Sequence, residues 1–217
     1  LLNDIGFLSE RWVQKYEKRF LSEEEFHRLG KALAETENRG ISIHAIAAIR
    51  LLLLTGCRKN EILTLKWNEV DLEAGTLKLS DSKTGSRTVP LSPEAVEVLS
   101  GIPRMDGNPW VIPGKAEGKP MQNLRTSWRS LCKRAGIEDM RIHDCRHSFA
   151  SRALALGESL PAIGKLLGHS QVETTARYAH LAQDSVREAT QRISDSIAAE
   201  AFRRYQPVRD CREGGIG

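Results

Sequence analysis

Two different spacings of apolar residues follow one another along this chain, and they predict helices on either side of a short stretch of sheet. Ser22 can cap a helix, with Glu25 three residues on completing a capping box, and this helix is expected to run to about residue 37. Residues 41–55 are apolar almost all round, which is typical of a central, buried helix, and Gly56 is expected to end it.

Further along, the apolar spacing shortens to every second residue. Residues 70–72, 76–79 and 88–91 are therefore predicted to form three short strands of an antiparallel meander, joined by turns at 73–75 and 82–85. This order of elements predicts an α+β fold that is mainly α-helical, with one small three-stranded antiparallel sheet. Further helices are expected at residues 58–65, from Ser92, and at residues 121–135, 144–156, 160–167, 171–178 and 182–200, with a Gly- and Pro-rich loop at 101–120.

The composition fits one large domain, with or without an appendage. The chain has 217 residues, of which 40% are hydrophobic, and a net charge of +4, which permits nucleic-acid binding without requiring it. Its four cysteines lack a paired spacing, which favours reduced thiols in a cytosolic protein over a disulfide framework. We expect no signal peptide and no membrane span, because the most apolar run, residues 41–54, is too short and contains His44 and Arg50.

Six residues carry the candidate chemistry. A phosphodiester gains charge density when it is attacked, so cationic side chains can stabilise it, and a phenol oxygen can be the attacking atom. Taken one at a time, each residue has a plainer explanation, such as a surface arginine paired with Glu61 or a lysine in a solvated turn. The six residues are Arg58, Lys83, His143, Arg146, His169 and Tyr178.

A metal site is a second chemistry to consider. Residues 143–147 read HDCRH and contain four side chains of types that can bind zinc or other metals. Zinc sites usually need further ligands at a suitable spacing, and none is evident around the remaining cysteines. We therefore predict no metal site, and we interpret His147 as a structural residue.

The segments around the six residues are more informative than the residues alone. They read TGCRKNEIL at 55–63, SKTGS at 82–86, RIHDCRHSFAS at 141–151, LGHS at 167–170 and ARYAHL at 176–181. Together they resemble the catalytic domain of a tyrosine recombinase of the phage-integrase family. One mild departure is Cys145, which stands where the family more often has leucine and is apolar enough to pack there.

The resemblance implies cleavage and rejoining of DNA strands through a 3′-phosphotyrosyl intermediate. Tyr178 would be the nucleophile, and Lys83 would protonate the departing 5′ oxygen. Because one phosphodiester is exchanged for another, the resemblance implies no nucleotide. Because the arginines would neutralise the phosphate, it implies no metal or other cofactor either. The roles implied for the other residues are phosphate binding for Arg58, Arg146 and His169, acceptance of the tyrosine proton for His143, and support of the Arg58 rotamer by Glu61.

The implied partner is double-stranded DNA at recombination sites. Family members act as homotetramers on paired sites, with a monomer as the alternative in isolation, and the implied location is the bacterial cytoplasm, at the nucleoid. Some basic residues recur at every fourth position, which fits contact with phosphates, although a solvated helix flank explains it equally well. The basic residues predicted to contact DNA are Lys115, Lys119, Arg125, Arg129 and Lys133.

The expected organisation is a linker or upstream remnant at 1–20, the catalytic domain at 21–200 and a tail at 201–217. The favoured function is integration or excision of a mobile element. One rival hypothesis is a type IB topoisomerase, which shares the chemistry but usually has lysine where His143 stands. A second is a non-catalytic DNA-binding module, and a third is a purely structural helical domain, which leaves the order of the six residues unexplained.

Overall fold

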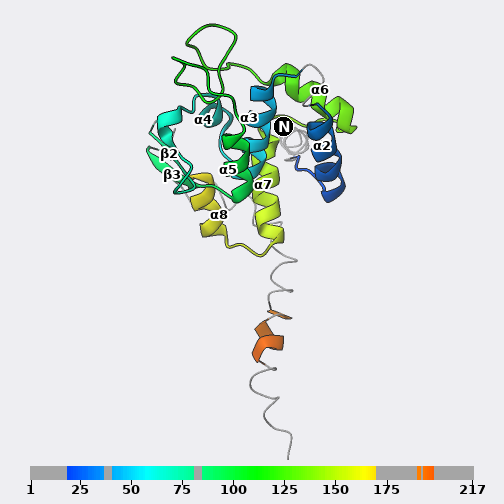
Figure 1. Ribbon diagram of the computed structural model, residues 1–217. Helices are drawn as coiled ribbons and strands as arrows, with labels where there is room; N and C mark the ends of the chain where they lie inside the picture. The colour runs from blue at the N-terminus through cyan, green and yellow to red at the C-terminus, as the bar shows by residue number, and fades with distance from the viewer. Residues whose placement is uncertain (1–18, 37–40, 81–84, 170–189, 192, 198–217) are drawn as a thin grey trace, which may run out of the picture.

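The computed structural model describes residues 19–36, 41–80, 85–169, 190–191 and 193–197. This part of the chain is mainly helical, with one small antiparallel sheet (Figure 1), so the fold class predicted from the sequence is confirmed. The elements are α2 (Glu23–Thr36), α3 (Ile43–Thr55), α4 (Lys59–Leu63), the 3-10 turn η1 (Trp67–Glu69), β1 (Val70–Asp71), β2 (Thr76–Leu79), β3 (Arg87–Pro90), α5 (Pro93–Ser100), α6 (Arg125–Ala135), α7 (Asp144–Ala155) and α8 (Leu160–Leu167).

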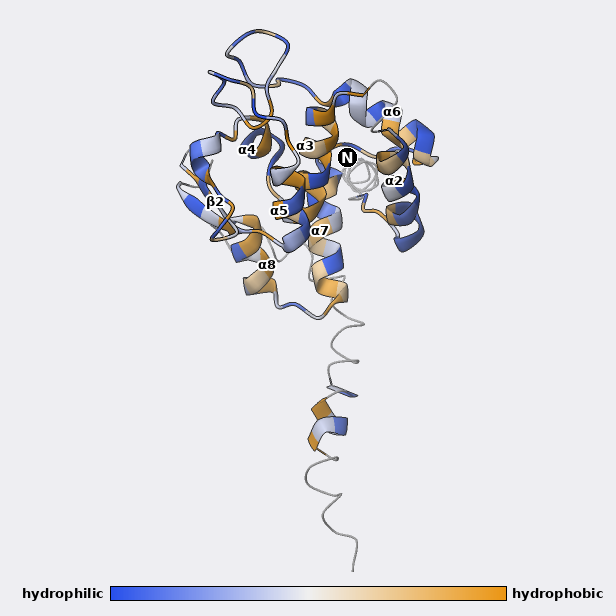
Figure 2. Cartoon of the chain, viewed as in Figure 1, coloured by the Kyte–Doolittle hydropathy of each residue, from blue (hydrophilic) through white to orange (hydrophobic). Residues whose placement is uncertain are grey.

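Helix α3 lies at the centre of the fold, as its uniformly apolar sequence predicts. Most of its residues are buried, and it packs against α5, α6 and α7. Figure 2 shows it as an apolar element among helices whose outer sides are hydrophilic. Gly56 ends α3 in the left-handed conformation, with φ at 63°, and its N–H bonds to Leu52 O, which is the ordinary way to close a helix with glycine.

The sheet is a meander in the order β1-β2-β3. Strand β3 begins one residue before the predicted 88–91, and it pairs with β2 so that Arg87 lies opposite Leu79. Residues opposite each other in an antiparallel pair point to the same face. Leu79 is buried, as are Leu77 and Val89 on that same face. The sheet therefore directs a guanidinium toward the protein interior.

Two helix starts follow the local sequence as predicted. The Ser22 N–H donates to the Glu25 carboxylate at 3.0 Å, and the Glu25 N–H donates to Ser22 Oγ at 3.2 Å, which completes the capping box of α2. Ser92 Oγ accepts from the Ala95 N–H at 3.3 Å at the start of α5. In both cases a side chain satisfies a backbone group that the helix itself leaves unpaired.

Helix α6 begins at Arg125, four residues after the start that the apolar spacing from Met121 predicts. The Asn123 side chain accepts a hydrogen bond from the Arg125 N–H at 2.7 Å and so holds a turn just before the helix. Met121 is still half-buried, and Trp128 within the helix is buried. The apolar spacing therefore predicts which residues face the core, whereas Asn123 determines where the helix begins.

The loop from residue 101 to 124 contains no named helix or strand, in agreement with the loop predicted at 101–120. An isolated bridge from Lys66 to Trp110 ties it to the domain, and a second bridge, from Pro113 to Pro120, pairs two parts of the loop itself. Within the described residues, no helix is long and apolar enough to cross a membrane.

Replacing Gly56 with alanine is expected to lower the free energy of unfolding by about 2–5 kcal/mol, because left-handed backbone strain and overpacking add. An added Cβ would lie 2.7 Å from Phe149 Cδ1 and 2.9 Å from Leu167 Cδ2. Gly136 also ends a helix with positive φ, but among the described residues no atom lies within 4 Å of its added Cβ. Gly136→Ala is therefore the matched control and should lose only about 1–2 kcal/mol in urea unfolding. Equal losses in the two variants would contradict the packing argument.

Candidate active site

Three arginine side chains converge on the C-terminal end of α8. Arg58 caps α4, Arg87 is the first residue of β3, and Arg146 lies in the first turn of α7. These three positions are far apart in the sequence. The last carbonyl groups of a helix are unpaired and carry partial negative charge, so they attract cations. The bonds run to three consecutive carbonyl oxygens: from Arg87 Nη1 to Leu166 (2.9 Å), from Arg146 Nη2 to Leu167 (2.7 Å) and from Arg58 Nη2 to Gly168 (3.1 Å).

Glu61 lies between two of these arginines. Its Oε1 accepts from Arg58 Nη1 at 2.9 Å, and its Oε2 accepts from Arg87 Nη2 at 2.9 Å and from the Arg58 backbone N–H at 2.7 Å. The Glu61 side chain is only 5% exposed, and a carboxylate this buried needs compensating cations. The geometry fits the predicted support of the Arg58 rotamer. We call Arg58, Glu61, Arg87 and Arg146 the arginine cluster.

Arg146 joins two helix ends inside the protein. It is buried in the first turn of α7, and its Nη1 donates to Gly56 O at 2.8 Å while its Nη2 donates to Leu167 O. His143, three residues earlier, is exposed. The two members of the predicted H-x-x-R pair therefore have different environments, with the guanidinium inside and the imidazole at the surface.

The environment of His143 favours its neutral form. The residue caps α7, and its ring meets the ring of buried His147 edge-on, with centroids 5.1 Å apart. Partial removal of the ring from water lowers the pKa of His143, and the positive charge of Arg146 lowers it further. A neutral imidazole can accept a proton, which is the role predicted for His143.

His169 directly follows the residue that caps α8, and its backbone N–H closes the last turn of that helix. The structure thus gathers Arg58, Arg146 and His169 at one helix end, although they are far apart in the sequence. Lys83 and Tyr178 lie outside the described residues, so their predicted roles stay predictions.

Arg87 belongs to the cluster, although the sequence analysis assigns it no role. The predicted strand at 88–91 excludes it. Alternation along β3 places Arg87 on the side of buried Val89, and a charged residue on the buried side of a strand is the indication that the sequence offers. Its side chain is 12% exposed, and Nη2 also lies 3.6 Å from Cys57 Sγ.

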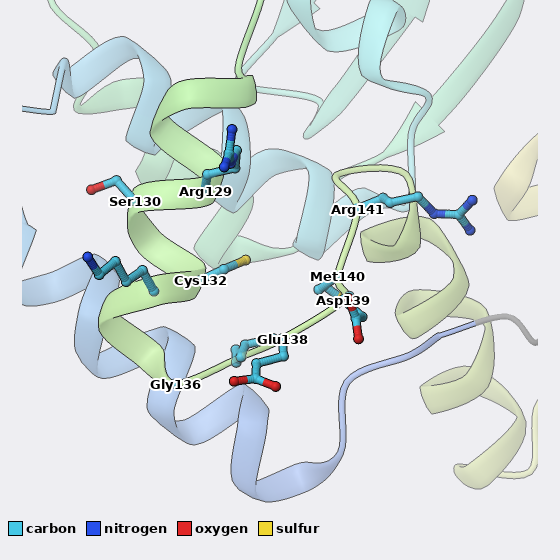
Figure 3. Close-up of a pocket in the computed structure, with 10 residues that line it drawn as sticks. Arg129, Ser130, Cys132, Gly136, Glu138, Asp139, Met140 and Arg141 are labelled. Atoms are coloured by element: carbon cyan, nitrogen blue, oxygen red, sulfur yellow. The ribbon is translucent and has the colours of Figure 1, made fainter.

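The basic residues predicted to contact DNA are all exposed, on the loop before α6 and on α6 itself. Arg129 and Lys133 also line a hollow between α6 and the loop that follows it, together with the acidic Glu138 and Asp139 (Figure 3). The predicted DNA contacts are Lys115, Lys119, Arg125, Arg129 and Lys133.

Three thiols are buried away from solvent. Cys57, Cys132 and Cys145 are free, and burial raises the pKa of Cys132 to about 11 and raises the pKa values of the other two thiols as well. Protonated, buried thiols are unreactive packing residues. Among the residues that the structure describes, no group of three or more His, Cys, Asp or Glu side chains is arranged to hold a metal ion.

The arginine cluster carries a net positive charge. Three guanidinium groups and one carboxylate leave a charge of two positive units. The Arg58 side chain is 22% exposed and that of Arg87 is 12% exposed, so Arg58 is the more exposed of the two. Guanidinium groups held in place can bind a phosphate and stabilise the charge that develops when it is attacked.

Replacing Arg141 with glutamine is expected to raise the pKa of His143. The positive charge of Arg141 contributes to the lowered pKa, and the same side chain pairs with the buried Asp144 carboxylate at 2.9 Å. The substitution removes a cation and leaves that carboxylate less neutralised, and both changes favour protonated imidazole. The His143 Cε1 proton can be followed by NMR as a function of pH, with Arg28→Gln on α2 as a control of equal charge change. A pKa that falls or stays constant in Arg141→Gln would refute this account.

Comparisons with known proteins agree with this geometry. The sequence model of the phage integrase family matches residues 19–185. The chain is 32% identical over 182 residues to the shufflon-specific DNA recombinase of Escherichia coli, covering 82% of this chain and 44% of that protein. It is 33% identical over 185 residues to tyrosine recombinase XerD of Rhizobium meliloti (strain 1021), covering 79% of this chain and 60% of that protein. The chain thus spans about half the length of these two relatives.

A solved structure gives the corresponding match in three dimensions. The catalytic domain of bacteriophage HP1 integrase superposes with a TM-score of 0.60 at 29% identity, covering 81% of this chain and 95% of that domain. The family match extends over more than half of the chain, and the fold agrees with it. The chain belongs to the phage integrase family, and its fold is that of a tyrosine recombinase catalytic domain.

Proposed function

We propose that this chain is the catalytic part of a site-specific DNA recombinase that integrates or excises a mobile element. The observation that carries the proposal is that His169 follows the end of α8 at which Arg58 and Arg146 meet, in an arginine cluster with net positive charge. A phosphoryl group under attack needs such cations. Membership of the phage integrase family supports DNA as the source of that phosphate, and the Escherichia coli relative is a DNA recombinase by name.

In the cleavage step, Tyr178 Oη attacks the scissile phosphorus, and the bond from phosphorus to the 5′ oxygen breaks. Neutral His143 accepts the phenol proton, and Lys83 gives a proton to the departing oxygen, which would otherwise leave as an alkoxide. Arg58 and Arg146 stabilise the added negative charge. The products are a 3′-phosphotyrosyl protein and a DNA end with a free 5′ hydroxyl.

Rejoining is the reverse reaction with a different strand. The 5′ hydroxyl of the partner strand attacks the phosphotyrosine, Lys83 takes up its proton, and His143 returns a proton to the departing Tyr178 phenolate. Each step exchanges one phosphate ester for another, so bond energy is conserved. The reaction therefore needs no nucleotide, and because the arginines neutralise the phosphate it needs no metal ion either.

The whole protein would assemble on DNA as a homotetramer at paired sites, within the bacterial cytoplasm and at the nucleoid. The catalytic domain would occupy residues 21–200, with a linker before it and a tail after it. The exposed basic residues on α6 and the preceding loop would contact phosphates along the duplex and set binding strength rather than sequence choice. These basic residues are Lys115, Lys119, Arg125, Arg129 and Lys133.

A covalent protein–DNA adduct is expected from the full-length protein and not from its Tyr178→Phe variant. The substrate is a pool of nicked duplexes with a randomised centre, in which the short fragment beside the nick diffuses away after cleavage and traps the adduct. Adducts are detected on a denaturing gel with EDTA present, and sequencing of the trapped DNA yields the target site. Tyr16→Phe is the matched control and should still form the adduct.

Two results would count against the proposed function. One is the absence of an adduct from a pool that the protein demonstrably retains on a filter, which would favour a non-catalytic DNA-binding module. The other is failure to retain any duplex of the pool. An adduct that persists in Tyr178→Phe would keep the reaction but assign the nucleophile to another residue.

Replacing Lys83 with alanine is expected to slow cleavage of ordinary DNA by about 10²–10⁴-fold, the usual contribution of a general acid. The same variant should cleave DNA that carries sulfur in place of the 5′ bridging oxygen at close to the wild-type rate. A thiol has a pKa of about 8.5, so its thiolate leaves without a proton. Lys78→Ala, which removes an exposed lysine from β2, is the control. Equal slowing of Lys83→Ala on both substrates would exclude the role of proton donor.

A further inference from the structure

Arg87 directs its guanidinium into the protein rather than toward solvent. Its Nη1 donates to Leu166 O and its Nη2 to Glu61 Oε2, both at 2.9 Å, and the side chain is 12% exposed. A Cβ added at Gly168 would lie 2.6–2.9 Å from Arg87 Cδ, Nε and Cζ, so the guanidinium is pressed against the backbone at the end of α8. These contacts hold the guanidinium of Arg87 within the protein.

Glu61 creates an electrostatic difficulty for Arg58. The carboxylate is buried, and it lies 2.9 Å from Arg58 Nη1, so on its own it would largely cancel the charge that Arg58 presents to an anion. Arg87 places a second positive charge at the same distance of 2.9 Å from the other carboxylate oxygen. With that second cation in place, the positive charge of Arg58 stays available.

The second contact of Arg87 concerns the last turn of α8. Leu166 stands three residues before His169, and the next two carbonyl groups accept from Arg146 and Arg58. Arg87 therefore completes the row of three bonds that holds this helix end. The row fixes the position from which the chain enters His169.

We propose that Arg87 is a positioning residue for the recombinase reaction. It neutralises Glu61 and holds the end of α8. Through these two contacts it keeps the positive charge of Arg58 available to the scissile phosphate and the guanidinium aimed at it, without touching the phosphate itself. The inference rests on the proposed function. It gives β3 a part in the reaction that is separate from its position after Lys83 in the sequence.

Arg87→Gln is expected to lower the single-turnover cleavage rate constant at saturating protein by about 100-fold, while the Kd for DNA stays within about twofold of wild type. Arg28→Gln is the matched control, because it removes one positive charge from a 44% exposed side chain on α2. An unchanged rate in Arg87→Gln would overturn the proposal. A loss of DNA affinity as large as the loss of rate would also overturn it, because Arg87 would then act as a phosphate ligand.

Adding Glu61→Gln to Arg87→Gln tests the charge argument directly. A neutral amide needs no second cation, so the double variant should recover at least about tenfold of the lost rate, as expected for residues that are coupled rather than independent. A loss caused only by the missing bond to Leu166 O would not be repaired by a second substitution at Glu61. A double variant as slow as Arg87→Gln, or slower, would therefore rule out the neutralising role.

Folding must be checked, because Arg87→Gln removes one partner of a buried ion pair. Circular dichroism at the assay temperature provides that check. If the variant does not fold, Arg87→Lys becomes the deciding variant. It keeps the charge, but one ammonium cannot reach both Glu61 and Leu166 O. Slow cleavage at unchanged DNA affinity is therefore expected, and cleavage at the wild-type rate refutes the proposal. Wild-type protein is assayed in every series, and a wild type that forms no adduct refutes the recombinase function itself.

Discussion

The C-terminal end of α8 is the point on which the site depends. Its last carbonyl groups have no partners within the helix, and they carry partial negative charge toward the interior. Arginines from α4, β3 and α7 satisfy three of these carbonyls in order, and each brings its own segment of chain to the same place. A simple requirement of helix geometry, that the last carbonyls find donors, thus assembles a cationic site from distant parts of the sequence.

The same helix end accounts for two glycines and a buried carboxylate. Gly56 offers its carbonyl to Arg146 and leaves no room for a Cβ against Phe149, while Gly168 leaves space for Arg87. Three neighbouring guanidinium groups repel one another, and Glu61 offsets part of that repulsion from a position that water hardly reaches. Folding and chemistry therefore use the same contacts, so the packing that stabilises the domain also holds the cations that an attacked phosphate requires.

Where the physical cause is local, the sequence predicts the structure well. The capping box of Ser22 and the apolar character of α3 each lie within a few residues, and both predictions are confirmed. The start of α6 is predicted four residues too early, because the apolar spacing continues through a turn that the Asn123 side chain holds. Arg87 could not be placed, since its partners lie 26 and 79 residues away and alternation along a strand shows only that it faces inward.

For the site, it is the resemblance in sequence order that predicts Arg58, Arg146 and His169, and the structure adds a physical reason for their meeting. The chain leaves α8 at His169 and reaches Tyr178 nine residues later, so the helix end that binds the arginines is also the start of the segment that contains the predicted nucleophile. A shift of α8 displaces the row of carbonyls and His169 together. A change of charge at Glu61 acts instead on Arg58 and Arg87, because the carboxylate pairs directly with both guanidinium groups. The balance of charge inside the cluster, more than its position in the fold, therefore determines how strongly it can stabilise a phosphate under attack.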